Sequence, residues 1–125
     1  MTHAIRRLPD SELEVMQAVW ACTPPVSRAD IEAKLQTSHP MALTTLLTLL
    51  TRLTEKGFLT AEKAGRGKCY TPTVSRPDYL AAQSRRFLDK LCGGSLPAFA
   101  AALCDSGLSR DELAQLREFL ERDAL

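Results

Sequence analysis

The sequence contains no asparagine, has only 6% aromatic residues and lacks any long apolar run. The segment closest to such a run, 41–53, is interrupted by five polar residues: Thr44, Thr45, Thr48, Thr51 and Arg52. A membrane-spanning helix needs about 20 consecutive apolar residues, so a transmembrane span is not expected. Two arginines near the start are followed by no apolar segment, which argues against a secretion signal. We therefore expect a cytoplasmic protein.

Patterns typical of metal sites and disulfide frameworks are also missing. No CxxC pair occurs, and the cysteines and histidines are widely spaced: Cys22, Cys69, Cys92 and Cys104, and His3 and His39. Zinc sites usually hold ligands two to four residues apart, so we expect no metal and no cofactor. Without a secreted context, the cysteines are expected to be reduced and mostly buried.

The sequence carries no recognisable catalytic motif. The patterns GxSxG, HExxH and a glycine-rich phosphate loop are all absent. The acidic pairs Glu12/Glu14 and Asp111/Glu112 lie in expected first helical turns, where negative charge complements the helix dipole. We predict that the protein is not an enzyme.

Charge is distributed unevenly along the 125 residues. Residues 1–74 hold nine basic and seven acidic side chains, a net +2, whereas residues 75–125 hold seven and eight, a net −1. Within 56–68, four basic residues face one acidic residue, a net +3. A local basic cluster permits contact with nucleic acid even where the whole-chain charge is only +1.

Helical periodicity appears three times in the first half of the chain. The first helix is predicted from Ser11 to Trp20, with Ser11 and Glu14 forming a capping box and prolines following its end. Ser27 is expected to cap a second helix, which ends before the break at 37–40. A third helix is predicted over 41–56, with Gly57 as its left-handed terminating residue.

The third helix has two chemically distinct faces. At 100° per residue, one side carries only leucines: Leu43, Leu46, Leu49, Leu50 and Leu53. The other side is polar, with Leu47 at the edge: Thr44, Thr48, Thr51 and Glu55, with Thr45 and Arg52 alongside. One face is therefore expected to be buried and the other to be available for a partner.

The period then changes from 3.6 to 2. Residues 58–63 and 68–72 are predicted to be strands joined by a glycine-containing tip at 64–67. Three helices followed by a two-stranded ribbon are typical of a winged helix-turn-helix. We predict a mainly α fold with a small β-hairpin, in which residues 1–74 form the winged-helix domain.

Residues 75–125 are predicted to form three further helices, which begin near Ser75, Leu96 and Ser109. They contain too few large apolar residues to form a core alone, so we expect a helical dimerisation region that pairs with a second copy. The residues expected at this interface lie on helical stripes: Tyr79, Leu80, Phe87, Leu88, Leu91, Phe99, Leu103, Leu113, Leu116, Phe119 and Leu120.

A helix-turn-helix places its second helix in the DNA major groove. The threonines are suited to base edges, and the basic residues to phosphates. The predicted DNA-binding residues are Thr44, Thr45, Thr48, Thr51, Arg52, Lys63, Arg66 and Lys68. Two other interpretations remain open: a merely solvated helix face beside an ordinary hairpin, and an adaptor in which Leu43 and Leu47 dock a protein instead of DNA.

The sequence resembles the penicillinase-repressor family of bacterial winged-helix repressors, which includes methicillin-resistance and copper-responsive repressors. The matching stretches are LEVM followed by Trp20, TLxTLLxRLxxKG, RGKxYTP and LSxxEL, at 13–20, 45–57, 66–72 and 108–113. The resemblance covers about residues 8–120. It implies a homodimer that binds a palindromic operator in double-stranded DNA and represses transcription.

The resemblance also implies how repression is relieved, and here the sequence departs from the family. Members that respond to β-lactams are cleaved at an Asn–Phe bond after activation of a membrane sensor protease, but this chain has no asparagine, and its nearest segment is 97–104. It also lacks the CxCx4CxC tail of copper-responsive members. Thr44 and Leu47 replace lysine or another polar residue, which implies a different operator sequence.

Overall fold

The structure, a computed structural model, describes residues 5–123. Its residues form two compact units, the first ending at Ala82 and the second beginning at Gln83. This division lies later in the chain than the boundary that we expected after residue 74. The mainly α architecture with a small antiparallel sheet confirms the predicted fold class. None of the described helices is both long and apolar enough to cross a membrane.

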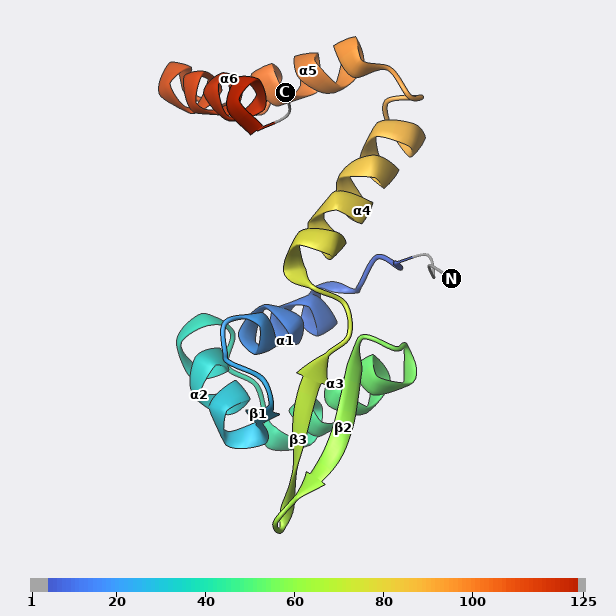
Figure 1. Cartoon of the computed structure of the whole chain (residues 1–125), viewed down its shortest axis with the longest axis vertical. Helices are drawn as coiled ribbons and strands as arrows, with labels where there is room; N and C mark the ends of the chain where they lie inside the picture. The colour runs from blue at the N-terminus through green and yellow to red at the C-terminus, as the bar shows by residue number, and fades with distance from the viewer. Residues whose placement is uncertain (1–4, 124–125) are drawn as a thin grey trace. The chain divides into compact units, whose positions relative to one another are not determined.

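Unit 1 contains three helices packed on a small sheet, together with the start of a fourth helix (Figure 1). The helices are α1 (Asp10–Trp20), α2 (Arg28–Ser38) and α3 (Leu43–Glu55). Ser27 caps α2 as predicted, because its hydroxyl oxygen accepts a hydrogen bond from the amide of Asp30. The predicted capping box of α1 is wrong: the helix begins at Asp10 after Pro9, and no side chain caps it.

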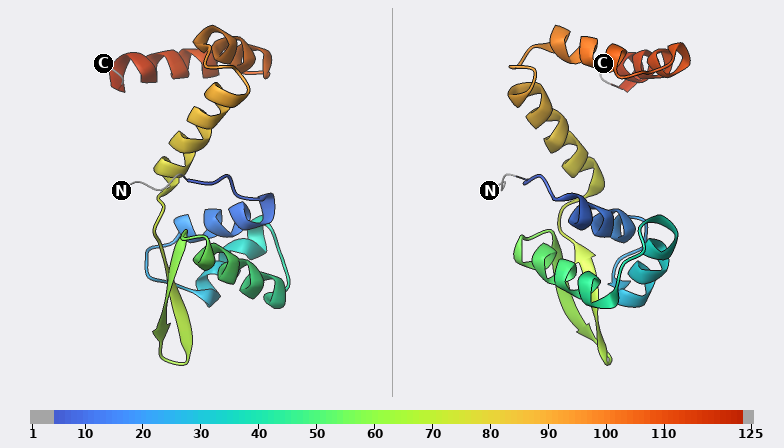
Figure 2. Two further views of the ribbon diagram at one scale, coloured as in Figure 1. Left: turned by 90° about the vertical axis from the view of Figure 1, so that its right-hand side faces the viewer. Right: turned by 180° about the vertical axis from the view of Figure 1, so that it is seen from behind.

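The sheet has three antiparallel strands in the order β1-β3-β2: β1 (Val26–Ser27), β2 (Leu59–Ala64) and β3 (Gly67–Pro72). Both strands of the hairpin lie within one residue of the prediction. The two-residue β1 was not predicted, since a segment so short has no period and is defined only by pairing with β3. Both views in Figure 2 show the β2–β3 hairpin, hereafter the wing, extending past the helices of unit 1.

The hydrophobic core of unit 1 draws on every one of its elements. Its buried apolar residues are Leu8, Val15, Met16, Ala18, Val19, Val26, Ile31, Leu35, Leu46, Leu49, Leu50, Leu53, Phe58, Leu59, Tyr70 and Tyr79. Gly57 has a φ of 82°, as expected for the residue that ends α3. This left-handed turn lets the chain enter β2 with Phe58 and Leu59 directed into the core.

Tyr79, which we expected at a dimer interface, belongs instead to the core of unit 1. It is 4% exposed, and its ring lies 5.7 Å from that of Trp20 and 6.0 Å from that of Phe58. Its hydroxyl oxygen accepts a hydrogen bond from the amide of Leu8 at 2.9 Å. The start of α4 (Arg76–Lys90) is thereby fastened to unit 1, and the side chain of Tyr79 is unavailable to a second copy.

Unit 2 comprises the rest of α4 with α5 (Leu96–Asp105) and α6 (Arg110–Asp123). Ser109 and Glu112 form the predicted capping box, in which each side-chain oxygen accepts a hydrogen bond from the other residue's amide. The rings of Phe87 and Phe99 meet edge to face with centroids 5.3 Å apart. No side chain described in this unit is buried, so the unit lacks a core of its own.

Candidate nucleic-acid interface

The two faces of α3 separate as the sequence predicted, with one exception. Leu46, Leu49, Leu50 and Leu53 are buried, whereas Thr44, Thr45, Thr48, Thr51 and Arg52 are all exposed. Leu43, which we expected on the buried side, is 44% exposed. It is the first residue of α3, and only the later leucines of the stripe reach the core.

Hydrogen bonding within α3 decides what two of the threonines can offer a partner. The hydroxyl of Thr48 donates to the carbonyl oxygen of Thr44, and that of Thr51 donates to the carbonyl oxygen of Leu47, both at 3.0 Å. Their hydroxyl protons are therefore used inside the helix. In this conformation each offers acceptor lone pairs and a methyl group, which suit the amino groups of adenine or cytosine and the methyl group of thymine.

A concavity of about 370 Å³ lies along one edge of the exposed face of α3. Thr44, Thr45, Thr48 and Arg52 line it together with Ser11 from the start of α1. The sequence suggested only a capping role for Ser11, since no local pattern shows that α1 and α3 meet at this point. The structure therefore brings four of the predicted residues onto one surface and adds a hydroxyl group to it.

The opposite edge of α3 faces a larger concavity of about 540 Å³, hereafter the wing groove. Its polar and apolar lining comes from α2, α3 and the wing, and includes Arg28, Leu47, Thr51, Arg66, Lys68 and Tyr70. Burial raises the pKa of the Tyr70 hydroxyl, and the positive charge of Arg28 partly opposes that shift. Arg28 was not among the predicted residues, because its position beside α3 depends on the packing of α2.

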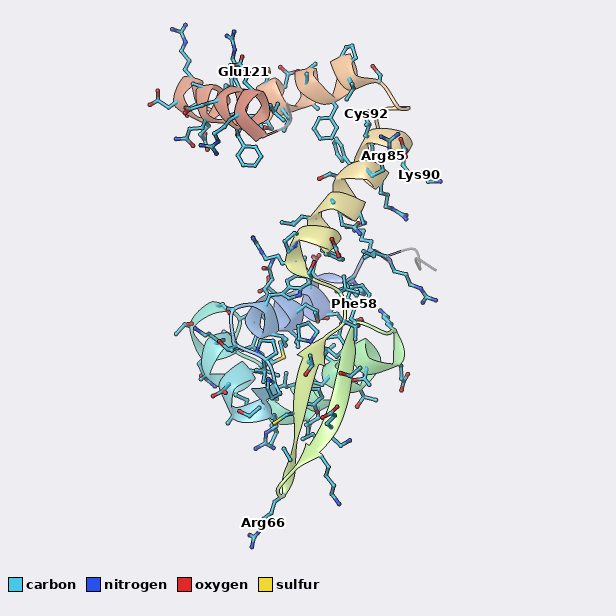
Figure 3. All side chains as sticks on the ribbon, in the orientation of Figure 1. Phe58, Arg66, Arg85, Lys90, Cys92 and Glu121 are labelled. Atoms are coloured by element: carbon cyan, nitrogen blue, oxygen red, sulfur yellow. The ribbon has the colours of Figure 1, made fainter. Side chains whose placement is uncertain are left out.

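The wing carries cations that have no acidic partner within residues 5–123. Lys63 and Lys68 are directly paired across β2 and β3, so two like charges lie on the same face of the ribbon. Arg66 lies at the tip between two glycines, of which Gly65 has a φ of 60°, and its side chain points outward from the wing tip, away from the helices of unit 1 (Figure 3). Close like charges disfavour each other, so an anionic partner would stabilise this arrangement.

Lys56 does not belong to this cationic set, although the sequence placed it in the net +3 segment. Its Nζ lies 2.6 Å from Oε1 of Glu12, whose side chain is 4% exposed. The ion pair links the end of α3 to α1 and neutralises a charge that we had counted toward a nucleic-acid surface. The available cations near α3 are therefore Arg52, Lys63, Arg66 and Lys68.

The residues expected at a dimer interface, Tyr79 apart, lie at the surface or are half-buried. Leu80, Phe87, Leu91, Phe119 and Leu120 are exposed, between 39% and 76%. The others are half-buried: Leu88, Phe99, Leu103, Leu113 and Leu116.

Potential metal ligands are scattered in the structure. All four cysteines are free thiols, but the expectation that most are buried is wrong: Cys104 is exposed and the other three are only half-buried. His39 is the exposed residue after α2, and His3 lies outside the described residues. Across residues 5–123, no three histidine, cysteine or acidic side chains come close enough to hold a metal ion.

The sequence is similar to those of known bacterial repressors. Residues 8–122 match the family model described as penicillinase repressor. The chain is 30% identical over 118 residues to the penicillinase repressor of Bacillus licheniformis, which covers 94% of this chain and 91% of that protein. It is 27% identical over 123 residues to the methicillin resistance regulatory protein MecI of Mammaliicoccus sciuri. This alignment covers 98% of this chain and 99% of that protein.

A solved structure shows the same similarity. It is the solution structure of monomeric Bacillus licheniformis BlaI in complex with the blaP half-operator. The match has a TM-score of 0.50 and 33% sequence identity, and it covers 60% of this chain and 90% of that chain. The similar protein thus binds a half-operator.

Proposed function

Because this chain belongs to the penicillinase-repressor family, we propose that it is a sequence-specific DNA-binding repressor of transcription. The family consists of repressors and not of enzymes, in agreement with the absence of catalytic motifs from the sequence. The observation that carries the proposal is the surface of unit 1, where an exposed threonine face lies beside four cations without acidic partners among the described residues.

The exposed face of α3 would enter the major groove. Thr44, Thr45, Thr48 and Thr51 would lie against base edges, since a recognition helix reads bases with the side chains of its exposed face. Arg52 on α3 and Lys63, Arg66 and Lys68 on the wing would contact phosphates on either side of the groove. A DNA partner would place the protein in the cytoplasm.

Unit 2 would pair two copies of the chain on a palindromic operator. Its helices bury no described side chain in one copy and expose Phe87, Leu91, Leu96, Phe119 and Leu120. Burying a large apolar side chain contributes about 1.5–3 kcal/mol, so a symmetric interface is the natural place for these residues. Two wings and two recognition helices would then meet half-sites separated by about one helical turn or a multiple of it.

Binding of duplex DNA at graded salt concentrations tests the proposal. Four cations in each protomer give about eight phosphate contacts in a dimer, for which log K should fall against log salt with a slope of about −7. The duplexes would be selected from a randomised library by the purified full chain. Failure to retain any duplex at low salt would contradict the proposal.

The exposed Leu43 and Leu47 favour a second candidate function, a protein adaptor that does not bind DNA. An adaptor of this kind should bind its partner through α3 with little salt dependence and should retain no duplex. Loss of DNA binding on added salt separates the two functions, because only phosphate neutralisation releases counterions.

The mode of release would differ from cleavage at an asparagine–phenylalanine bond. This sequence contains no asparagine, and Phe99 in α5 follows an alanine. A sensor protease acting on this chain would have to cut a different bond. Incubation with an activated sensor, followed by mass spectrometry, would show whether any cut occurs in unit 2.

A further inference from the structure

We propose that Leu47 determines operator specificity by contacting the 5-methyl group of a thymine at the part of each half-site nearest the wing. The inference rests on the proposed DNA-binding function and assigns to it a thymine contact at the wing side of α3, separate from any contact made by the threonine methyl groups. It concerns an apolar side chain that the core of unit 1 does not use.

The exposure of Leu47 is unusual among the leucines in the middle of α3. Leu47 is 40% exposed, whereas its neighbours Leu46 and Leu50 are each 1% exposed in the core. It lines the wing groove together with Thr51. The hydroxyl proton of Thr51 is bonded to the carbonyl oxygen of Leu47, so Thr51 adds an acceptor and a methyl group but no donor. This edge of α3 is therefore largely apolar toward a partner.

The charges around Leu47 identify the kind of partner. Lys68 lines the same groove, and Arg66 borders it at the wing tip with its side chain directed outward; neither has an acidic partner within the described residues. A partner that fits the groove must present both negative charge and a small apolar group. In duplex DNA the phosphates supply the charge, and the thymine methyl is the apolar group exposed in the major groove.

Leu43 provides a matched contrast on the same helix. It is 44% exposed, but it lines a separate concavity of about 190 Å³ together with Glu32 and Gln36 of α2. No basic residue among those described lines this concavity and Glu32 is paired with Arg28, so a phosphate-bearing partner finds no free cation there. Truncation of Leu43 therefore removes a similar exposed side chain without removing the proposed methyl contact.

The test uses duplexes selected by the full-length protein from a randomised library, with each thymine replaced in turn by deoxyuridine. This change removes only the 5-methyl group. Burial of one such group is worth about 0.8 kcal/mol, which corresponds to about a fourfold change in affinity for each half-site. We expect one position at which wild-type binding weakens about fourfold, and about 15-fold when both half-sites are changed.

The Leu47→Ala protein should bind the thymine and deoxyuridine duplexes equally at that position, whereas Leu43→Ala should retain the wild-type difference. Replacing the thymine by 5-methylcytosine should preserve more affinity than replacing it by cytosine, since only the former keeps the methyl group. Leu47→Gln provides a second variant that keeps side-chain length but removes the apolar end.

Three results would count against this inference. If selected duplexes bind specifically but no deoxyuridine substitution matters, Leu47 does not contact a methyl group. If the wild type and all three variants lose the same affinity on substitution, another residue makes the contact. If no duplex is retained at low salt, the proposed DNA-binding function itself fails, which is distinguishable from the two preceding outcomes.

Discussion

Both units contain helices with apolar stripes, but they differ in what those stripes cover. In unit 1, sixteen apolar residues between Leu8 and Tyr79 are buried within a single copy. In unit 2, no described side chain is buried, and Leu91 is 76% exposed. An apolar stripe therefore does not by itself indicate a core. In unit 1, a sheet and three helices pack their apolar stripes against one another in a common core. The stripes of unit 2 remain available to a partner.

The largest expected effect comes from placing charge on the apolar stripe of α6. The double variant Leu116→Glu and Leu120→Glu should be monomeric, and its affinity for a complete operator should fall by about 10²–10⁴-fold, because the second half-site contact is no longer intramolecular. Sedimentation and duplex binding would measure the two effects.

A matched control places a charge elsewhere on α6, with Ala114→Glu on the other side of the helix. That protein should remain dimeric. A dimeric Leu116/Leu120 variant would show that this stripe is not the interface and would weaken the contrast between the units.

Two truncated chains would sharpen the boundary between the units. A chain that ends at residue 82 keeps Tyr79, whereas a chain that ends at residue 74 loses its ring contacts and its bond to Leu8. Loss of a large buried aromatic side chain costs about 3–5 kcal/mol, so the shorter chain should unfold at much lower urea. Fluorescence of Trp20, the only tryptophan, reports on unit 1 directly. Equal stabilities would place the boundary before α4.

Removal of Lys56 would test the ion pair inside unit 1. Lys56→Met leaves the Glu12 carboxylate buried without its partner, and the free energy of unfolding should fall by about 3–5 kcal/mol. Arg28→Ala breaks the exposed Arg28–Glu32 pair of the same unit and should cost only about 0.5 kcal/mol. Urea titration followed by Trp20 fluorescence would measure both. If both variants lost a similar free energy of unfolding, burial of Glu12 would not make its ion pair more stabilising than the exposed Arg28–Glu32 pair.

Substitutions on the DNA-facing surface should change binding without changing the oligomeric state. Thr48→Ala should cost about 1–3 kcal/mol on a selected operator and little on random DNA. Arg66→Ala should weaken both and reduce the salt slope by about one unit for each protomer. Arg85→Ala removes a cation that is paired with Asp89 in unit 2, and it should leave the slope unchanged. Equal effects of the first two variants on all DNA would contradict their assigned roles.

Features that depend on short sequence spacings were predicted well. The buried positions of Leu46, Leu49, Leu50 and Leu53 follow from a 3.6-residue period, and the hairpin strands follow from a period of two. The caps at Ser27 and Ser109 likewise involve residues three apart, although the capping box predicted at Ser11 with the same spacing does not form. Each of these signals involves residues close together in the sequence, so it does not depend on how distant elements pack.

Most of the features that were missed depend on residues far apart in the sequence. The strand β1 exists only through pairing with β3, 42 or more residues later in the chain. The bond between Leu8 and Tyr79 joins residues 71 apart, and the contact between Glu12 and Lys56 joins residues 44 apart. No local spacing reports such pairs, because they form only when separate elements pack.

The sequence by itself therefore determined where the helices and the hairpin form and which threonines and basic residues they carry. Tertiary structure decided which of those groups remain free for a partner. Lys56 and Arg66 are both cations in one basic segment, yet packing ties the first to Glu12 and leaves the second at the tip of the wing. Local periodicity selects a backbone conformation within a few residues, but the availability of a charge depends on what distant elements bring beside it.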